Sequence, residues 1–272
     1  MIEKSQILLT NDDGIESPGL WAAAEALSEL GFVHVIAPRL QSSGAGRSLP
    51  SSSDGRIAPQ TLRVHDKDWT VYAVGGTPAQ AVLHGVLEII GTLPALVVSG
   101  INYGENVGTS VTVSGTVGAA LEAATLGIPS MAVSLQVPSG YYFSYSREID
   151  FSAARYFTQL FGRLMLENHF PADVDLLKLD IPANATPATP WEITRQSRHR
   201  YYVPIPPQRK TWEEPAVVGY EMAVDPHELP EDTDIYALLV KQVVSVTPLS
   251  IDLTSRVSLH ELEALLRGTP SQ

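Results

Sequence analysis

The sequence predicts an α/β fold: a doubly wound, mostly parallel sheet of the Rossmann-like kind, followed by extended C-terminal hairpin or arm elements for oligomerisation. Three observations support this prediction. Short β-like runs alternate with helical patterns through the first half of the chain, which indicates βαβ units. One run, Ala95–Ser99, is continuously apolar, as is typical of a strand covered on both faces. The 272 residues, 44% of them hydrophobic and 18% charged, are enough to bury a core of this kind.

The first half of the chain is expected to supply five strands and three helices. The strands are expected at Gln6–Thr10, Val33–Ala37, Val71–Val74, Ala95–Ser99 and Ser130–Leu135. The first helix, Pro18–Leu30, has apolar residues at helical spacing. The second begins after the helix cap Thr77 and runs to Ile90, and the third is expected over Gly115–Leu126. This order of elements is typical of a parallel sheet with helices on both faces.

The second half is less regular. A helix is expected over Ile149–Glu167, and a Pro-rich stretch over residues 183–232 predicts hairpins or an arm. The remaining strand-like runs are Leu176–Ile181, Trp191–Thr194, Ile235–Val240 and Val243–Thr247. A final helix begins at Ser258. We expect one domain over residues 1–272, with an arm and a terminal helix in residues 183–272 that are used in subunit exchange.

The net charge of −12 makes long nucleic acids and anionic membranes poor partners. The basic cluster at Arg195–Arg200 is better explained as a solvated strand face or a contact with an acidic neighbouring subunit. Cysteine is absent, which excludes disulfides, thiolate zinc sites and cysteine nucleophiles. The apolar run Ile7–Thr10 near the N-terminus is too short for a signal-peptide core, so a cytoplasmic protein is expected.

Polar clusters follow several of the expected strands, where doubly wound folds bind their ligands. After the first strand comes Asn11-Asp12-Asp13-Gly14, whose adjacent carboxylates repel each other. A divalent cation with oxygen ligands, such as Mg²⁺, Mn²⁺ or Ca²⁺, would offset that repulsion. The alternative is a solvated Asp-Gly turn that leads into the following helix.

Three further clusters have a functional and a structural explanation each. In the segment Arg39–Ser48, small residues can expose backbone N–H groups to an anion, and Ser42 or Ser43 can offer a hydroxyl to a metal. The alternative is that this segment is an ordinary loop. Gly100–Gly108 offers Asn102 and Asn106 as metal or phosphate ligands, or is a Gly/Asn turn. The helix start at Ser114-Gly115-Thr116 suits a phosphate group, or Ser114 is a plain helix cap.

Taken together, two carboxylates, a hydroxyl and an asparagine amide beside a phosphate-binding helix end indicate metal-assisted phosphoester chemistry. Other site types find little support. The seven histidines are scattered without an H-x-x-x-H pair, which disfavours a zinc site. The sequence has no Gly-x-Ser-x-Gly elbow, no Walker A motif and no G-x-G-x-x-G after the first strand.

The chain resembles the SurE survival-protein family in motifs that run in order along most of its length. These are Leu8–Gly14, Ala37-Pro38 with Ser42–Ser48, Gly76–Pro78, Ser99–Asn106, Ser114–Glu122 and, more weakly, Lys178–Pro182, Thr233-Asp234 and Val244–Pro248. Members of that family are metal-dependent nucleoside monophosphate phosphatases (5′/3′-nucleotidases), and some also act on short polyphosphate. The resemblance implies a phosphomonoesterase that hydrolyses nucleoside 5′-monophosphates, and 3′-monophosphates as well, to nucleoside and phosphate.

The resemblance also implies the site residues. One divalent metal ion per subunit, Mg²⁺ or Mn²⁺, is expected on Asp12, Asp13, Ser43 and Asn102, where Ser43 is chosen because the family ligand lies five residues after the proline of Ala37-Pro38. The phosphate is expected among Asn11, Gly44, Asn106, Ser114, Gly115 and Thr116, with Asp12, Asp13 and Asn11 as the catalytic set. Family members form homodimers or homotetramers with exchanged C-terminal elements, in line with the Pro-rich arm.

This chain departs from the family pattern at a few positions. Arg47 stands where His or Asn is more usual, and Gln80 where an acidic residue is more usual. Two other functions are kept as alternatives: a metal-dependent nucleotide-sugar enzyme, and a protein that binds a nucleotide without turnover. The aromatic run Tyr141–Tyr145 is explained equally well by base stacking and by packing at a subunit interface.

Overall fold

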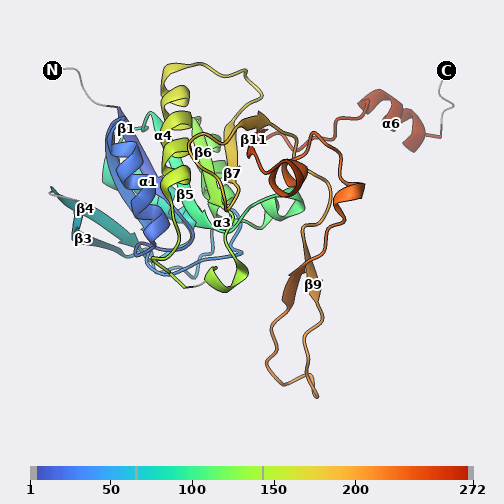
Figure 1. Cartoon of the computed structure of the whole chain (residues 1–272), viewed down its shortest axis with the longest axis horizontal. Coiled ribbons are helices and arrows are strands. Elements are labelled where there is room, and N and C mark those ends of the chain that lie inside the picture. Colours follow the sequence, from blue (N-terminus) through green and yellow to red (C-terminus); the bar gives the residue numbers. More distant parts are fainter. Residues whose placement is uncertain (1–4, 65–66, 143, 269–272) are drawn as a thin grey trace.

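The computed structural model describes residues 5–64, 67–142 and 144–268 of the chain (Figure 1). In these residues a nine-stranded sheet has the order β3-β4-β2-β1-β5-β6-β7-β11-β8, and a separate hairpin pairs β10 with β9. The sheet strands are β1 (Gln6–Thr10), β2 (Phe32–Pro38), β3 (Ile57–Val64), β4 (Lys67–Val74), β5 (Leu96–Tyr103), β6 (Ser130–Leu135), β7 (Leu176–Ile181), β8 (Trp191–Ile193) and β11 (Val244–Leu249). The hairpin strands are β9 (Tyr202–Ile205) and β10 (Gly219–Met222).

The helices lie between these strands and after the last of them. The α-helices are α1 (Pro18–Ser28), α2 (Pro78–His84), α3 (Gly115–Thr125), α4 (Ser152–Glu167), α5 (Asp234–Tyr236) and α6 (Leu259–Leu266). The π-helical segments η1 (Gly85–Ile90) and η5 (Ala237–Lys241) continue α2 and α5. Short 3₁₀ turns are η2 (Gly108–Thr112), η3 (Ser139–Tyr141) and η4 (Pro226–Glu228).

The sheet is parallel through its centre and covered on both faces, which confirms the doubly wound prediction. Strands β4, β2, β1, β5, β6 and β7 run parallel, whereas β3 and β11 pair antiparallel with their neighbours β4 and β7. Within β1, Ile7 and Leu9 pack in the core under α1 and α4, and Leu8 packs in the core under α2 and α3. This alternation follows from the period of two in a strand. The carboxyl ends of the parallel strands therefore meet at one edge of the sheet.

The five strands and three helices expected in the first half are confirmed, but a strand was missed there. Strand β4 begins at Lys67, and its antiparallel partner β3 lies at the outer edge of the sheet. Strand β3 contains Pro59, which cannot donate a ladder hydrogen bond and is typical of an edge strand. Its residues alternate poorly between polar and apolar, so the sequence carried little signal for it.

The expectation of a strand over Ile235–Val240 is wrong, because this segment forms α5 and η5. Ile235 and Leu238, three residues apart, pack with Val107 and Tyr201 in a small separate core. A six-residue apolar run does not by itself distinguish strand from helix. The helix predicted over Ile149–Glu167 begins later, at Ser152, after the Asp150 carboxylate accepts the Ser152 backbone N–H at 2.8 Å.

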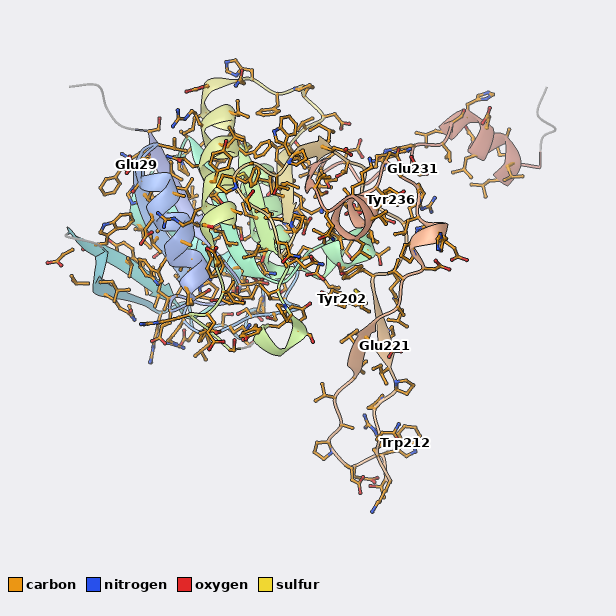
Figure 2. All side chains as sticks on the ribbon, viewed as in Figure 1. Glu29, Tyr202, Trp212, Glu221, Glu231 and Tyr236 are labelled. Atoms are coloured by element: carbon orange, nitrogen blue, oxygen red, sulfur yellow. The ribbon has the colours of Figure 1, made fainter. Side chains whose placement is uncertain are left out.

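The segment 183–232 contains both a sheet strand and an arm. Its strand β8 forms the other outer edge of the sheet, beside β11, and is three residues long. The β9–β10 hairpin projects far from the body, and α6 stands apart from it near the C-terminal end (Figure 1). Figure 2 shows Tyr202 at the root of this arm and Trp212, whose surface is 87% exposed, at its far end. In the described ranges we find no helix whose length and apolar character would let it cross a membrane.

Candidate functional site

The candidate site begins where β1 ends. The Asn11 amide closes the following turn: its Oδ1 accepts the Gly14 N–H at 3.1 Å and its Nδ2 donates to the Gly14 carbonyl at 3.0 Å. Gly14 has a φ of 98°, which favours glycine. This closed turn fixes the backbone of Asp12 and Asp13 directly beyond the strand. Both polar atoms of Asn11 are thereby used within the turn.

Asp12 lies against the N-terminus of α3. Its side chain is 4% exposed, and its Oδ1 accepts the Thr116 hydroxyl at 2.5 Å. A Cβ atom added to Gly115 would lie 2.8 Å from the Asp12 Oδ2, so only glycine lets the helix approach this closely. Burial raises the pKa of Asp12, while hydrogen bonds from Thr116 and from the backbone of Thr116 and Gly115 act in the opposite direction.

Asp13 is held on the other side, by β5 and by the loop after β2. It is 2% exposed; its Oδ1 accepts from the Gln41 amide and its Oδ2 from the Tyr103 backbone N–H, each at 3.1 Å. Burial, and then the charge of Asp12, raise the pKa of Asp13 to about 8. The two carboxylates therefore disfavour each other's ionisation.

The two carboxylates suit a divalent cation. Throughout the described ranges, neither forms an ion pair with a Lys, Arg or His side chain. In the same residues, no three or more His, Cys, Asp or Glu side chains gather as a metal cluster. Two adjacent, buried carboxylates need a positive charge to ionise together, and a cation there must complete its shell with neutral oxygens. This donor set fits Mg²⁺ or Mn²⁺.

The loop after β2 comes beside Asp12 and is anchored to α3. The Ser42 N–H donates to the Asp12 carbonyl at 2.7 Å, and the Gly46 N–H to the Val113 carbonyl at 3.0 Å. Ser43, between these two bonds, is exposed. Arg47, one of the departures from the family pattern, donates to the buried carboxylate of Glu122 at 2.6 Å, so its guanidinium is engaged within the chain.

The loop after β5 brings the asparagines to the same edge. The Asn102 Nδ2 donates to the Gly104 carbonyl at 2.7 Å, which leaves its side-chain oxygen as the atom suited to a cation. Asn106 is held by the two next strands, since its Nδ2 donates to the Ser134 hydroxyl at 2.8 Å and its backbone N–H to Asp180 at 2.7 Å. Ser114 caps α3 by accepting the Val117 N–H at 3.1 Å.

These contacts bring four segments together at the carboxyl ends of the parallel strands. The segments are the turn after β1, the loop after β2, the end of β5 and the start of α3. Sequence reasoning missed two residues that shape this site. Gln41 lies within the loop already singled out, but nothing in the sequence pointed to Asp13 as its partner. Tyr145 donates its hydroxyl to the Asp13 carbonyl at 2.6 Å, so part of the aromatic run contacts the site. Phe143 of that run lies outside the described residues.

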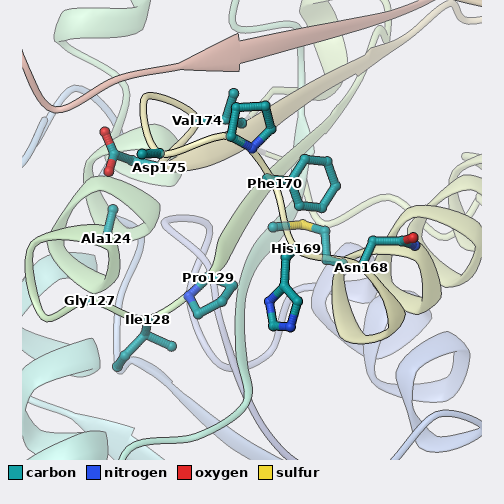
Figure 3. A pocket seen from close by; sticks show the side chains of 12 residues that line it. Ala124, Gly127, Ile128, Pro129, Asn168, His169, Phe170, Val174 and Asp175 are labelled. Atoms are coloured by element: carbon teal, nitrogen blue, oxygen red, sulfur yellow. The ribbon is translucent and has the colours of Figure 1, made fainter.

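The pocket in Figure 3 lies elsewhere. It has a volume of about 260 Å³ and is formed where α3 and α4 end and where the chain enters β6 and β7. Pro129, His169 and Asp175 line it, and none of the expected site residues does. It is therefore at the amino ends of the parallel strands, opposite the Asp12–Asp13 edge.

Comparison with known proteins yields one family. The family model described as Survival protein SurE matches residues 7–203. The chain is similar to "5'-nucleotidase SurE" of Thermococcus kodakarensis, at 40% identity over 97% of this chain and 100% of that protein. It is 42% identical to "5'-nucleotidase SurE" of Archaeoglobus fulgidus over 97% of this chain and 98% of that protein. A crystal structure of the SurE protein from Aquifex aeolicus is similar with a TM-score of 0.74 and 33% identity, over 96% of this chain and 99% of that one.

Proposed function

This chain belongs to the Survival protein SurE family, and from that premise we propose that it is a hydrolase that cleaves nucleoside 5′-monophosphates to nucleoside and phosphate. The observation that carries the proposal is the buried Asp12–Asp13 pair, which has no basic partner in the described residues and lies against the N-terminus of α3. The relatives named 5'-nucleotidase match the chain over nearly its whole length. Hydrolysis of 3′-monophosphates is part of the proposal.

Asp12, Asp13, Ser43 and Asn102 are the residues that would hold one divalent cation, Mg²⁺ or Mn²⁺. When bound, the cation would supply a Lewis acid that neutralises phosphate charge. Asp12 and Asp13 would provide the negative charge for it, and the Ser43 hydroxyl and the Asn102 side-chain oxygen would be its neutral ligands. The hydrogen bonds from Thr116, Gln41 and the backbone of Tyr103 orient the two carboxylates.

The phosphate would lie at the start of α3. The helix dipole favours an anion there, beside the helix cap Ser114, although the backbone N–H groups of Gly115 and Thr116 also bond to Asp12. Gly44, on the loop after β2, would contact the same phosphate. Gly44 has open space around it and a φ of 76°. Asn106 approaches from the β5 side. Asn11 acts by fixing the turn of Asp12 and Asp13, because its own polar atoms bond to Gly14.

Phosphate release from a panel of nucleoside 5′- and 3′-monophosphates, short polyphosphate and a nucleotide sugar tests this function. We expect release with Mg²⁺ or Mn²⁺, none with EDTA, and a loss on the order of 10³-fold in Asp12→Asn, because the substitution removes charge from the cation site. Asp252→Asn, at an exposed carboxylate, is the matched control and should keep full activity.

Two other outcomes point to the alternatives. Cleavage of the nucleotide sugar alone would indicate the transferase-like enzyme. A nucleotide-induced rise in melting temperature without any product would indicate a binding protein, and in both cases the nucleotidase proposal fails.

The arm and α6 support a second proposal, a homodimer or homotetramer assembled through these elements. Trp212 on the arm is 87% exposed, and Leu265 and Leu266 on α6 are 75% and 78% exposed. Apolar surface of this extent marks an association site. Light scattering should give a multiple of 29.4 kDa, and Leu265→Glu with Leu266→Glu should lower it. A monomer of the unaltered chain at micromolar concentration contradicts the proposal.

A further inference from the structure

Three charged side chains lie fully buried next to the candidate site, and the proposed chemistry does not use them. Lys178 and Asp180 point to the same face of β7, and Asp234 begins α5; all three are 0% exposed. The Lys178 ammonium pairs with the Asp180 carboxylate and lies 3.3 Å from the Asp234 Oδ2. The Lys178 ammonium thus bridges two carboxylates from distant parts of the chain.

Both carboxylates also hold the backbone of one loop segment. The Asp180 Oδ1 accepts the Asn106 N–H at 2.7 Å, and the Asp234 Oδ2 accepts the Gly108 N–H at 3.0 Å. The loop is therefore fixed at two points, two residues apart, by two acceptors that Lys178 ties together. Bonds from a backbone N–H to a charged carboxylate are stronger than those between neutral groups.

The Asn106 side chain is fixed from the neighbouring strand. Its Nδ2 donates to the Ser134 hydroxyl at 2.8 Å, and Ser134 on β6 lies opposite Asp180 on β7 in the sheet register. One strand end therefore holds the Asn106 backbone and the next holds its amide. Asn106 is 9% exposed, so these two bonds set both its position and its orientation.

The three buried charged side chains differ from the buried polar side chains beside them, which are uncharged. On β11, the hydroxyls of Ser245 and Thr247 each lie 2.8 Å from the Thr194 hydroxyl, and these hydroxyls are satisfied without any ion. A buried ion pair contributes little to stability when its desolvation is counted, but it can specify one geometry. The geometry specified here is that of residues 106–108.

We propose that Lys178, Asp180 and Asp234 are positioning residues that hold the segment 106–108 so that Asn106 meets the substrate phosphate. This inference rests on the proposed function. The three residues have no hydrogen bond or ion pair with Asp12, Asp13, Ser43 or Asn102 in the described part of the chain. Their effect should therefore fall on phosphate binding and not on the cation.

The test is Asp180→Asn in the full chain, since Asn can accept one hydrogen bond but its amide donor opposes the Lys178 ammonium. Inorganic phosphate is the probe, and its affinity is measured by calorimetry with Mn²⁺ present, together with KM and kcat. We expect phosphate affinity to fall about tenfold or more, KM to rise with it, and Mn²⁺ affinity to stay within about twofold. Ser245→Ala, opposite Asp180 on β11, is the matched control and should leave phosphate affinity unchanged.

A double-mutant cycle separates positioning from a general structural role. In an Asn106→Ala background, Asp180→Asn should add little, because the group it positions is already gone. Additive losses, an unchanged phosphate affinity, or an equal loss of Mn²⁺ affinity would each overturn the proposal. If Asp180→Asn does not fold, Lys178→Met with Asp180→Asn removes opposite charges together and enters the same cycle.

Failure of the proposed function is seen separately. A wild-type chain that binds phosphate but hydrolyses no nucleotide counts against the nucleotidase, while the cycle on phosphate affinity still decides the positioning role. A wild-type chain that releases phosphate from nucleotides but does not bind free phosphate overturns the positioning role and leaves the nucleotidase standing.

Discussion

Asp13→Asn is expected to stabilise the metal-free protein near pH 8 and, at the same time, to lower metal-dependent turnover strongly. Burial, and then the charge of Asp12, raise the pKa of Asp13 from 3.8 to about 8 in the folded chain. Between these values the folded chain keeps a proton that the unfolded chain has lost, so the wild-type stability falls as the pH rises through this window. Asn is neutral throughout and does not carry this penalty.

The expected gain in unfolding free energy is on the order of 3 kcal/mol near pH 8 and vanishes below about pH 4. The Gln41 amide, which donates to Asp13, can rotate to accept from the new side chain. Turnover should fall on the order of 10³-fold, because one of two charged cation ligands is lost. The change thus separates the stability of the site from its activity.

Melting temperatures with EDTA at both ends of this pH window, and again with Mn²⁺, provide the measurement. The wild type should melt lower as the pH rises and recover when Mn²⁺ is added, because the cation replaces the proton. Asp13→Asn should show a smaller response to both, because only the buried Asp12, whose pKa burial also raises, is left to ionise or to meet Mn²⁺. Parallel pH slopes for the two proteins would mean that Asp13 ionises freely in the fold.

Gly118→Ala should impair the site although alanine is the better helix former. A Cβ atom on Gly118 of α3 would lie 2.3 Å from the Gly46 carbonyl oxygen and 2.6 Å from the Arg47 nitrogen. These are backbone atoms of the loop that carries Ser43, so the loop must move away from α3. We expect Mn²⁺ affinity and kcat/KM to fall on the order of 10²-fold, with about 1–3 kcal/mol of destabilisation.

Gly140→Ala is the matched control, because a Cβ atom there meets nothing within 4 Å and its φ needs no glycine. Calorimetry with Mn²⁺ and the phosphate-release assay measure both variants. Full activity in Gly118→Ala would show that the close contact between α3 and the Ser43 loop is not needed for the site.

The elements predicted best from the sequence are those that are buried in the same way along their whole length. Strand β1 was expected with the bounds observed, because it is apolar and covered on both faces. The prediction of a strand over Ile235–Val240 was wrong for the opposite reason. The apolar run fits the period of a strand as well as that of a helix, and the contact with Tyr201 that decides between them comes from a remote part of the chain. Strand β3 was missed because an edge strand has no second neighbour to impose a pattern.

The candidate site was predictable where its residues adjoin strand ends. The Asp12–Asp13 turn and the start of α3 were visible as local patterns of carboxylates, glycine and a helix cap. The partners that tune them were not, since Gln41, Tyr145 and Asp180 meet the site only through tertiary packing. The Arg47–Glu122 pair belongs to the same class, because the residues lie 75 positions apart.

The two outer strands of the main sheet have a consequence for the protein at high concentration. Strand β8 is only three residues long, and β3 carries Pro59 within its eight residues. A long, regular edge offers a template on which foreign strands add and amyloid-like fibres grow. Edges this short or interrupted are poor templates, so the chain can display apolar side chains on its arm and α6 while its sheet resists open-ended growth.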